Sequence, residues 1–287
     1  MASGRLPAPT VRSAATPAPL RRVSVVRLYV RCLGASIRAQ MAYRTSFVLQ
    51  SVGQLLSTGS EFVGLWMLFG RAPSLAGWSL PQVAVFYGVI HVAFALAEAG
   101  ARGFDVFPML VRSGEFDRML LRPRGTAVQV AAHELQLMRV GRLLQGLAAL
   151  AWGMGATRAV GPSAWLLLGW AAIGGACIFA GLFILQATVS FWTVESLEIA
   201  NTVTYGGVQT AQYPLGVYRP WLRRFFTFVV PLACANYLPL SGLVGDRGRH
   251  AVPLAVAWAS PAAGLVFLLA ALAAWHMGVR HYRSTGS

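Results

Sequence analysis

The chain has 287 residues, of which 56% are hydrophobic and only 11% are charged. In an ordinary soluble domain about a quarter of the residues are charged, so this composition excludes that class and indicates a membrane protein. The formal net charge is +15, and every basic residue is an arginine because the sequence has no lysine. These arginines lie between long apolar runs and not on a polar domain, which argues against nucleic-acid binding.

The N-terminal part predicts a tail followed by an amphipathic helix. Residues 1–22 are rich in Pro, Ala, Ser and Arg without apolar periodicity, so we expect a disordered cytoplasmic tail. At 100° per residue the next stretch places one arc of apolar side chains beside an arc of arginines. The apolar arc is Val26, Val30, Leu33, Ile37 and Met41, and the basic arc is Arg27, Arg31 and Arg38. Such a helix lies in the membrane interface; the alternative is that it begins a long first span.

Six apolar segments are long enough to cross about 30 Å of hydrocarbon. They are residues 45–69, 79–101, 140–156, 163–189, 225–244 and 262–279. The third is the shortest, and the fifth contains Pro231 and Pro239, which interrupt helices. The sequence thus predicts an all-α integral membrane protein with six transmembrane helices.

Arginine positions predict the orientation, because basic residues in short loops remain on the cytoplasmic side. With the N-terminus inside, 20 of the 24 arginines are cytoplasmic. The four outside are Arg71, Arg158, Arg247 and Arg249. Among those assigned inside are Arg219, Arg223 and Arg224, which precede the fifth predicted span. We therefore expect both termini in the cytoplasm.

The second-to-third connection contains a short amphipathic element, residues 104–121, with aromatic and charged side chains. Pro108 suits a first helical turn, Gly114 permits a bend, and the Arg122-Pro123 pair disfavours helix beyond Leu121. A small helix with charges and exposed aromatics is either a docking surface for a partner or an interfacial anchor, and periodicity does not separate these two.

Polar residues recur on one face of the first predicted span. Gln50, Gln54, Ser57 and Glu61 are spaced by four, three and four residues. Acidic side chains inside a membrane are costly and usually face a bundle interior or a watery cavity, so Glu61 is the strongest candidate for a pathway or subunit-interface residue. The alternative is a structural carboxyl group bonded to a neighbouring helix.

Signals for catalysis or metal binding are weak. No GxxxxGK[ST] motif is possible without lysine, so any ATP must be hydrolysed by another chain. The histidines lack metal-ligand spacing, and no GxSxG elbow is present. Cys32, Cys177 and Cys234 show no CxxC spacing. We expect no enzyme activity, no catalytic residue and no metal or other cofactor in this chain.

Two runs resemble the membrane subunits of ABC exporters of the ABC-2 type, within an uncharacterised bacterial subgroup. They are SGEFDRMLLRP, residues 113–123, and FWTVESLEIANTVTYGGVQTAQYPLGVYRPWLRRFFTFVVPLACANYLP, residues 191–239. With the hydropathy pattern, the likeness extends from about residue 25 to the end. The resemblance implies one transmembrane domain over residues 23–287, with an N-terminal interface helix, six spans, a cytoplasmic coupling helix and re-entrant helices within residues 237–261.

The resemblance also implies roles for named residues. The coupling helix that presses into the ATPase would contain Gly114, Glu115, Phe116, Asp117 and Arg118. From charge placement, we expect the Gln50-to-Glu61 face to line the translocation path or the dimer seam. In the same way we expect Glu195 and Glu198, in the fourth-to-fifth connection, to contact the cytoplasmic gate or the ATPase.

The family works by ATP-driven alternating access. The resemblance implies two ATPase subunits that bind ATP and Mg, and a second permease chain, identical or paralogous, all in the lipid of a bacterial inner membrane. The rivals are an ATPase-independent secondary transporter or channel and a membrane-embedded enzyme. A secondary transporter should carry ion-coupled carboxylates and broken helices in both halves of the chain. In this sequence only Glu61 is predicted to lie well inside a span.

Overall fold

The computed structural model describes Gly34, Arg38 and residues 44–133, 140–157, 161–192, 197–244 and 252–282, with only the backbone of 197–200. The predicted tail, 1–22, lies outside these residues. So does the predicted interface helix, apart from Gly34 and Arg38, which are helical. Within the described ranges the regular structure is helical, except for one isolated bridge between Leu75 and Trp78.

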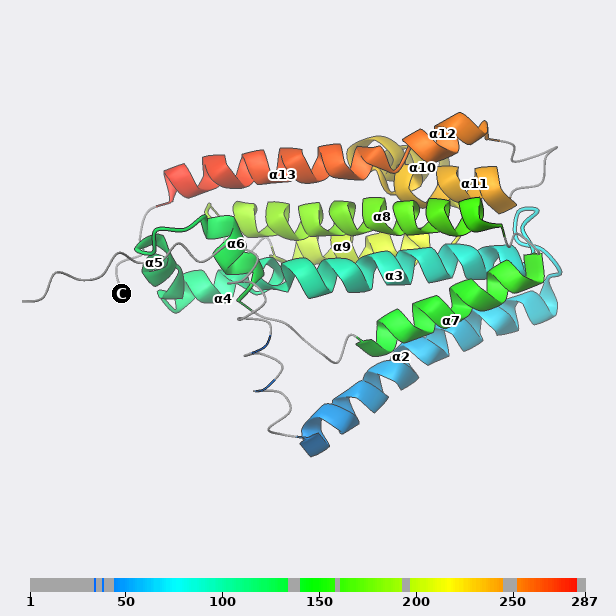
Figure 1. The fold of residues 1–287 in the computed structure, drawn as a ribbon, viewed down its shortest axis with the longest axis horizontal. Coiled ribbons are helices and arrows are strands. Elements are labelled where there is room, and N and C mark those ends of the chain that lie inside the picture. Colours follow the sequence, from blue (N-terminus) through cyan, green and yellow to red (C-terminus); the bar gives the residue numbers. More distant parts are fainter. Residues whose placement is uncertain are drawn as a thin grey trace, which may run out of the picture.

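Long helices packed side by side form the body of the molecule (Figure 1). Helices α8 and α3 lie at its centre, with α13 on one side and α7 and α2 on the other. The bounds are α2 (Arg44–Arg71), α3 (Leu80–Asp105), α7 (Val140–Thr157), α8 (Pro162–Val189) and α13 (Ala262–His281). Five of the six predicted spans therefore coincide with long helices.

Three helical stretches are long and apolar enough to cross a membrane, or four if a bent pair counts as one span. The three are Leu80–Arg112, Pro162–Val189 and Leu254–His281. Helices α2 and α7 have 28 and 18 residues but are less apolar, because polar side chains interrupt them. The multi-pass arrangement is clear, and the number six remains a prediction.

The predicted fifth span, 225–244, is wrong as a single helix. Helix α10 (Pro220–Arg224) and the π-helical turn Phe225–Val229 form one arm of a pair bent by 86°. The π-helical turn Ala233–Tyr237 and α11 (Leu238–Val244) form the other arm. Between the arms Val230 is extended (φ −116°, ψ 100°), as expected before a proline, and Pro231 has no N–H to continue a helix.

The second arm of this pair lies at the end of the bundle where α3 begins. The Gln82 side chain donates to the Val244 carbonyl at 2.6 Å, and the ring of Tyr237 lies 6.4 Å from that of Trp78. Helix α12 (Leu254–Ala259) is at the same end, where the Trp170 indole donates to the Trp258 carbonyl at 2.9 Å. The predicted re-entrant region thus contains short helices at one end of the bundle.

Helix α9 (Leu197–Ala211) was predicted to lie in a cytoplasmic connection, and it packs inside the bundle instead. Near its start Asn201 accepts a hydrogen bond from Gln186 at 3.0 Å, late in α8. At the other end of α9 the carbonyl of Ala211 accepts a hydrogen bond from the Asn236 amide at 2.5 Å. The same amide donates to the carbonyl of Phe86, early in α3, at 3.5 Å. Helix α9 therefore runs back along α8 toward the start of α3.

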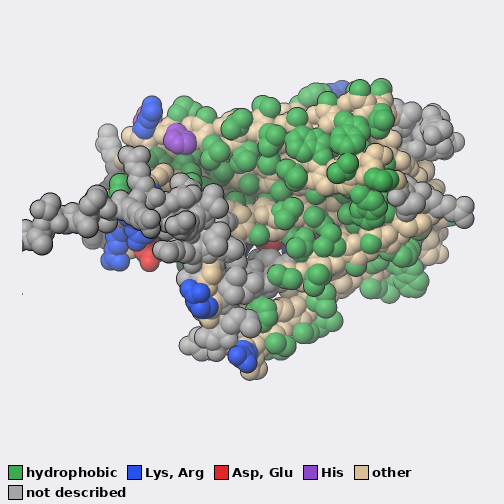
Figure 2. All heavy atoms as spheres, viewed as in Figure 1, with side chains coloured by type: hydrophobic (Ala, Val, Ile, Leu, Met, Phe, Trp, Pro, Cys, Tyr) green, Lys and Arg blue, Asp and Glu red, His purple; other side chains and the backbone are tan. Residues whose placement is uncertain are grey.

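The described arginines divide unequally between the two ends. Figure 2 shows apolar side chains along the body, with basic and histidine side chains mostly beyond one end of this band. We call this the basic end; it is formed by α4 (Phe107–Arg112), α5 (Glu115–Leu120) and the C-terminus of α13. Helix α9 runs from the basic end to the other end of the bundle. Arg219, Arg223 and Arg224, which follow it, therefore lie at the opposite end. They are predicted to lie on the same side as the 104–121 loop, and the structure places them at the other end of the bundle.

Candidate functional site

The loop at the basic end consists of α4, α5 and α6 (Thr126–Ala131). The expected break occurs at Gly114, whose φ of 68° is a left-handed conformation that glycine adopts without a steric penalty. Pro108 lies in the first turn of α4, as predicted, and α5 ends at Leu120 just before the Arg122-Pro123 pair. The amide of Gln129 then donates to the carbonyls of Met119 and Arg124 at 3.2 and 3.1 Å, which fastens α6 to α5.

The aromatic side chains of this loop are buried, so the prediction that they are exposed is wrong. Phe116 is 0% exposed, and its ring lies 4.8 Å from that of Phe107 and 5.1 Å from that of Tyr282. Trp275 of α13 packs on both phenylalanines. Burial and the neighbouring Asp117 carboxylate raise the pKa of Tyr282 to about 12. These contacts hold α5 against the C-terminal end of α13.

The outer surface of the loop is basic and apolar. Its exposed side chains include Met109, Arg112, Arg118, Leu120, Leu121 and Arg122. Glu115 is partly exposed and lies 3.7 Å from the His133 ring. Of the five residues predicted for the coupling helix, Arg118 is exposed and Glu115 is partly exposed, whereas Phe116 packs against its own chain.

A buried ionic network lies where α3 approaches the basic end. Glu98 is 1% exposed, between Arg102 at 3.7 Å and Arg142 of α7 at 3.4 Å. Arg102 also pairs with Asp105, one turn further along α3. The Arg142 guanidinium lies 4.9 Å from the centre of the Phe94 ring, a favourable cation–π distance.

Two further helices join this network. The Tyr205 hydroxyl of α9 accepts a hydrogen bond from Arg102 at 3.1 Å, and Gln186 of α8 donates to Asp105 at 3.3 Å. The sequence interpretation missed these residues because Glu98 was treated as part of an apolar run. The available signal was the spacing of Glu98, Arg102 and Asp105, which places three charges on one helical face.

Glu61 forms a second polar cluster with α3 and α9. Its side chain is 29% exposed; one carboxylate oxygen lies 3.8 Å from Nε2 of His91, and the other accepts from the Gln209 amide at 3.3 Å. Gln212 donates to the Gln209 side chain at 2.7 Å. His91 is 1% exposed, and neither ring nitrogen has a hydrogen-bond partner in the described structure.

The other predicted residues of this face extend along α2 from Glu61. Gln50 and Ser57 are exposed, and Gln54 is half-buried. The face is thus open in the single chain, and its role in a path or a dimer seam stays a prediction. Glu195 lies outside the described residues, and only the backbone of Glu198 is described, within α9.

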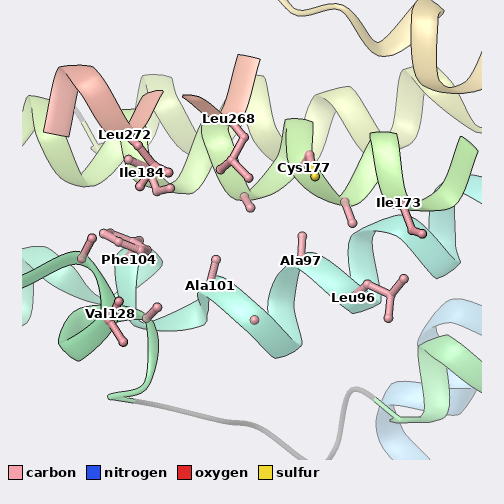
Figure 3. Close-up of a pocket in the computed structure, with 15 residues that line it drawn as sticks. Leu96, Ala97, Ala101, Phe104, Val128, Ile173, Cys177, Ile184, Leu268 and Leu272 are labelled. Atoms are coloured by element: carbon pink, nitrogen blue, oxygen red, sulfur yellow. The ribbon is translucent and has the colours of Figure 1, made fainter. Parts of the chain in front are cut away.

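An apolar groove of about 560 Å³ lies between α3, α6, α8 and α13 (Figure 3). Small side chains such as Ala97 and Ala180 line it together with Leu96, Ile173 and Leu268. Its lining is almost entirely apolar, so it suits hydrocarbon. The polar and charged side chains inside the bundle lie instead in the two clusters around Glu98 and Glu61.

A comparison with protein families gives one match. The profile of the family described as ABC-2 family transporter protein matches residues 55–286. The match takes in the loop at the basic end and both polar clusters. Neither the curated proteins nor the solved structures that were compared include a match.

Proposed function

The chain belongs to the ABC-2 transporter family, and from this premise we propose that it is the permease subunit of an ATP-driven exporter. It forms the translocation path with a second permease chain and is driven by two separate ATPase subunits, which bind ATP and Mg²⁺. The protein resides in a bacterial inner membrane, with the basic end in the cytoplasm, as expected from the positive-inside rule.

The observation that carries this proposal is the clamped loop at the basic end. Helix α5 presents Arg118 outward, while its Phe116 is locked against Trp275 of α13. A displacement of α5 would therefore be transmitted to α13, and through the contact of Phe116 with Phe107 also to the end of α3. Rigid transmission through packed side chains is what a coupling helix needs, because close-packed interiors transmit strain.

The second part of the proposal concerns the path. Helices α2, α3 and α9 share the Glu61 cluster, and the polar face from Gln50 to Glu61 is open in the single chain. Polar faces inside a membrane meet protein or water and not lipid, so a second permease chain, identical or paralogous, would cover this face. In this arrangement α9 is the fifth crossing element, and Glu195 and Glu198 precede and begin it on the cytoplasmic side, where they contact the gate.

The experiment is an affinity pull-down of the full chain from gently solubilised native membranes, with identification of stoichiometric partners and an ATPase assay. We expect a P-loop ATPase to be recovered with the wild-type chain and lost with Arg118→Glu, because the exposed arginine makes the contact. The matched control is Arg71→Glu, an exposed arginine at the opposite end, which should retain the ATPase. Recovery of the chain without an ATPase in several detergents would favour a secondary transporter or channel.

A further inference from the structure

The Glu61 cluster lacks a fixed counter-charge. Among the described residues its carboxylate meets the His91 ring at 3.8 Å and the neutral Gln209 amide at 3.3 Å. The arginine of the neighbouring network, Arg142, is engaged by Glu98 at 3.4 Å and by the Phe94 ring. A carboxylate in apolar surroundings is costly unless a cation neutralises it.

The cluster also contains buried polar atoms without a hydrogen-bond partner, and they include both acceptors and a donor, because one nitrogen of a neutral imidazole carries a proton. The side-chain oxygen of Gln212 is buried without a hydrogen-bond partner, and both ring nitrogens of His91 are in the same condition. His91 and Gln212 are 1% and 6% exposed, so they are held deep beside the partly exposed Glu61. A buried polar atom without a partner is unfavourable, which favours a ligand that donates hydrogen bonds to the acceptors among these atoms.

Aromatic rings border the same place. Phe62 follows Glu61 on α2, and its ring lies 5.3 Å from that of Tyr87 and 6.3 Å from that of Trp152. The Tyr87 ring in turn lies 4.0 Å from His91. Aromatic faces attract organic cations and also pack against the apolar body that carries the charge.

We propose that the Glu61 cluster binds the ammonium group of an amphiphilic amine, whose apolar body packs against the adjoining aromatic rings. An ammonium has only donors and one positive charge, which matches a carboxylate beside the Gln212 side-chain oxygen and the one acceptor nitrogen of a neutral His91. This inference rests on the proposed transport function, for which it names the class of substrate.

The test measures binding to the full chain in nanodiscs of phosphatidylglycerol, a lipid without an amine. The probe is dansylcadaverine, whose fluorescence reports transfer into an apolar site, and its N-acetylated form is the uncharged match. We expect the amine to bind at least tenfold more tightly than the acetylated form. Glu61→Gln should remove this preference without changing the affinity for the acetylated form.

Two variants separate charge from folding. Glu61→Asp keeps the charge and should keep most of the preference, and Arg71→Gln removes an exposed charge at the end of the same helix and should change nothing. Equal affinities of the wild type for the two probes would overturn the proposal, as would a preference that survives Glu61→Gln. Competition by added phosphatidylethanolamine would identify a lipid ammonium as the occupant, whereas no competition would identify a separate amine substrate.

This outcome is independent of the ATPase pull-down, because Glu61 is distant in sequence from the loop at the basic end and the binding assay needs no ATPase. Recovery of an ATPase without amine preference would retain the exporter and reject the substrate class. Amine preference without an ATPase would retain the site and reject the exporter.

Discussion

The pair of Glu98 and Arg142 joins two helices through charges withdrawn from solvent. The Glu98 side chain is 0% exposed and that of Arg142 is 13% exposed. We predict that Arg142→Met lowers the free energy of unfolding by about 1–3 kcal/mol, because a buried carboxylate loses one of its two arginine partners. Thermal unfolding in detergent, followed by intrinsic fluorescence, measures the change.

The matched control for this pair is Arg112→Met, which removes an exposed arginine of α4. It should change the stability by less than about 0.5 kcal/mol. Adding Glu98→Gln to Arg142→Met should restore part of the loss, since the buried charge is then removed as well. Strictly additive losses would show that the two side chains do not stabilise each other.

At the scale of residues, the sequence identified Glu61 through its spacing with Gln50 and Gln54. It did not identify His91 or Gln209 as neighbours of Glu61, because these belong to other helices and no local pattern records the contact. The burial of Phe116 was missed for the same reason, since its partner Trp275 lies near the C-terminus. Local periodicity defines a face, but only tertiary packing decides what that face meets.

Helices α3 and α6 approach closely at Gly103. A Cβ atom there would overlap the carbonyl group of Val130, whereas a Cβ at Gly100 in the same helix would meet nothing within 4 Å. We predict that Gly103→Ala destabilises the protein by about 1–3 kcal/mol, because α6 would have to move away from α3. The same thermal unfolding measurement reports the loss.

Gly100→Ala is the matched control on the same helix. It should be neutral or should stabilise the protein by up to about 1 kcal/mol, because alanine favours helix and nothing opposes its methyl group. Since α6 holds α5 through Gln129, Gly103→Ala should also weaken ATPase recovery in the pull-down. Equal stability of the two variants would contradict the close approach.

At the scale of elements, hydropathy predicted α2, α3, α7, α8 and α13 but failed for α9 and for residues 225–244. Helix α9 carries Asn201 and Gln209, and Gln212 follows its last residue. All three pair with other polar side chains, so the average composition of this stretch resembles that of a loop. Residues 225–244 are apolar throughout, yet Pro231 divides them into two arms bent by 86°. Hydropathy reports burial from water; it does not distinguish a span from a bent pair.

At the scale of the whole molecule, the corrected course of the chain changes the charge balance. In the proposed orientation, moving Arg219, Arg223 and Arg224 to the outside leaves 17 of the 24 arginines assigned to the cytoplasmic side. This asymmetry still favours the same orientation, because the loops next to the spans at the basic end retain most of the positive charge. The positive-inside rule and the packing of α9 are therefore compatible.

The proposed crossing by α9 makes a prediction about the two faces of the membrane. Ser113, between α4 and α5, and Arg223, in α10, are exposed at opposite ends of the bundle. In a background without Cys32, Cys177 and Cys234, Ser113→Cys and Arg223→Cys should react with a membrane-impermeant maleimide from opposite sides. In intact spheroplasts we expect labelling at position 223 and protection at 113, with labelling at 113 after lysis. Labelling of both positions from one side would mean that α9 does not cross, and would restore residues 225–244, despite their bend, as the fifth crossing.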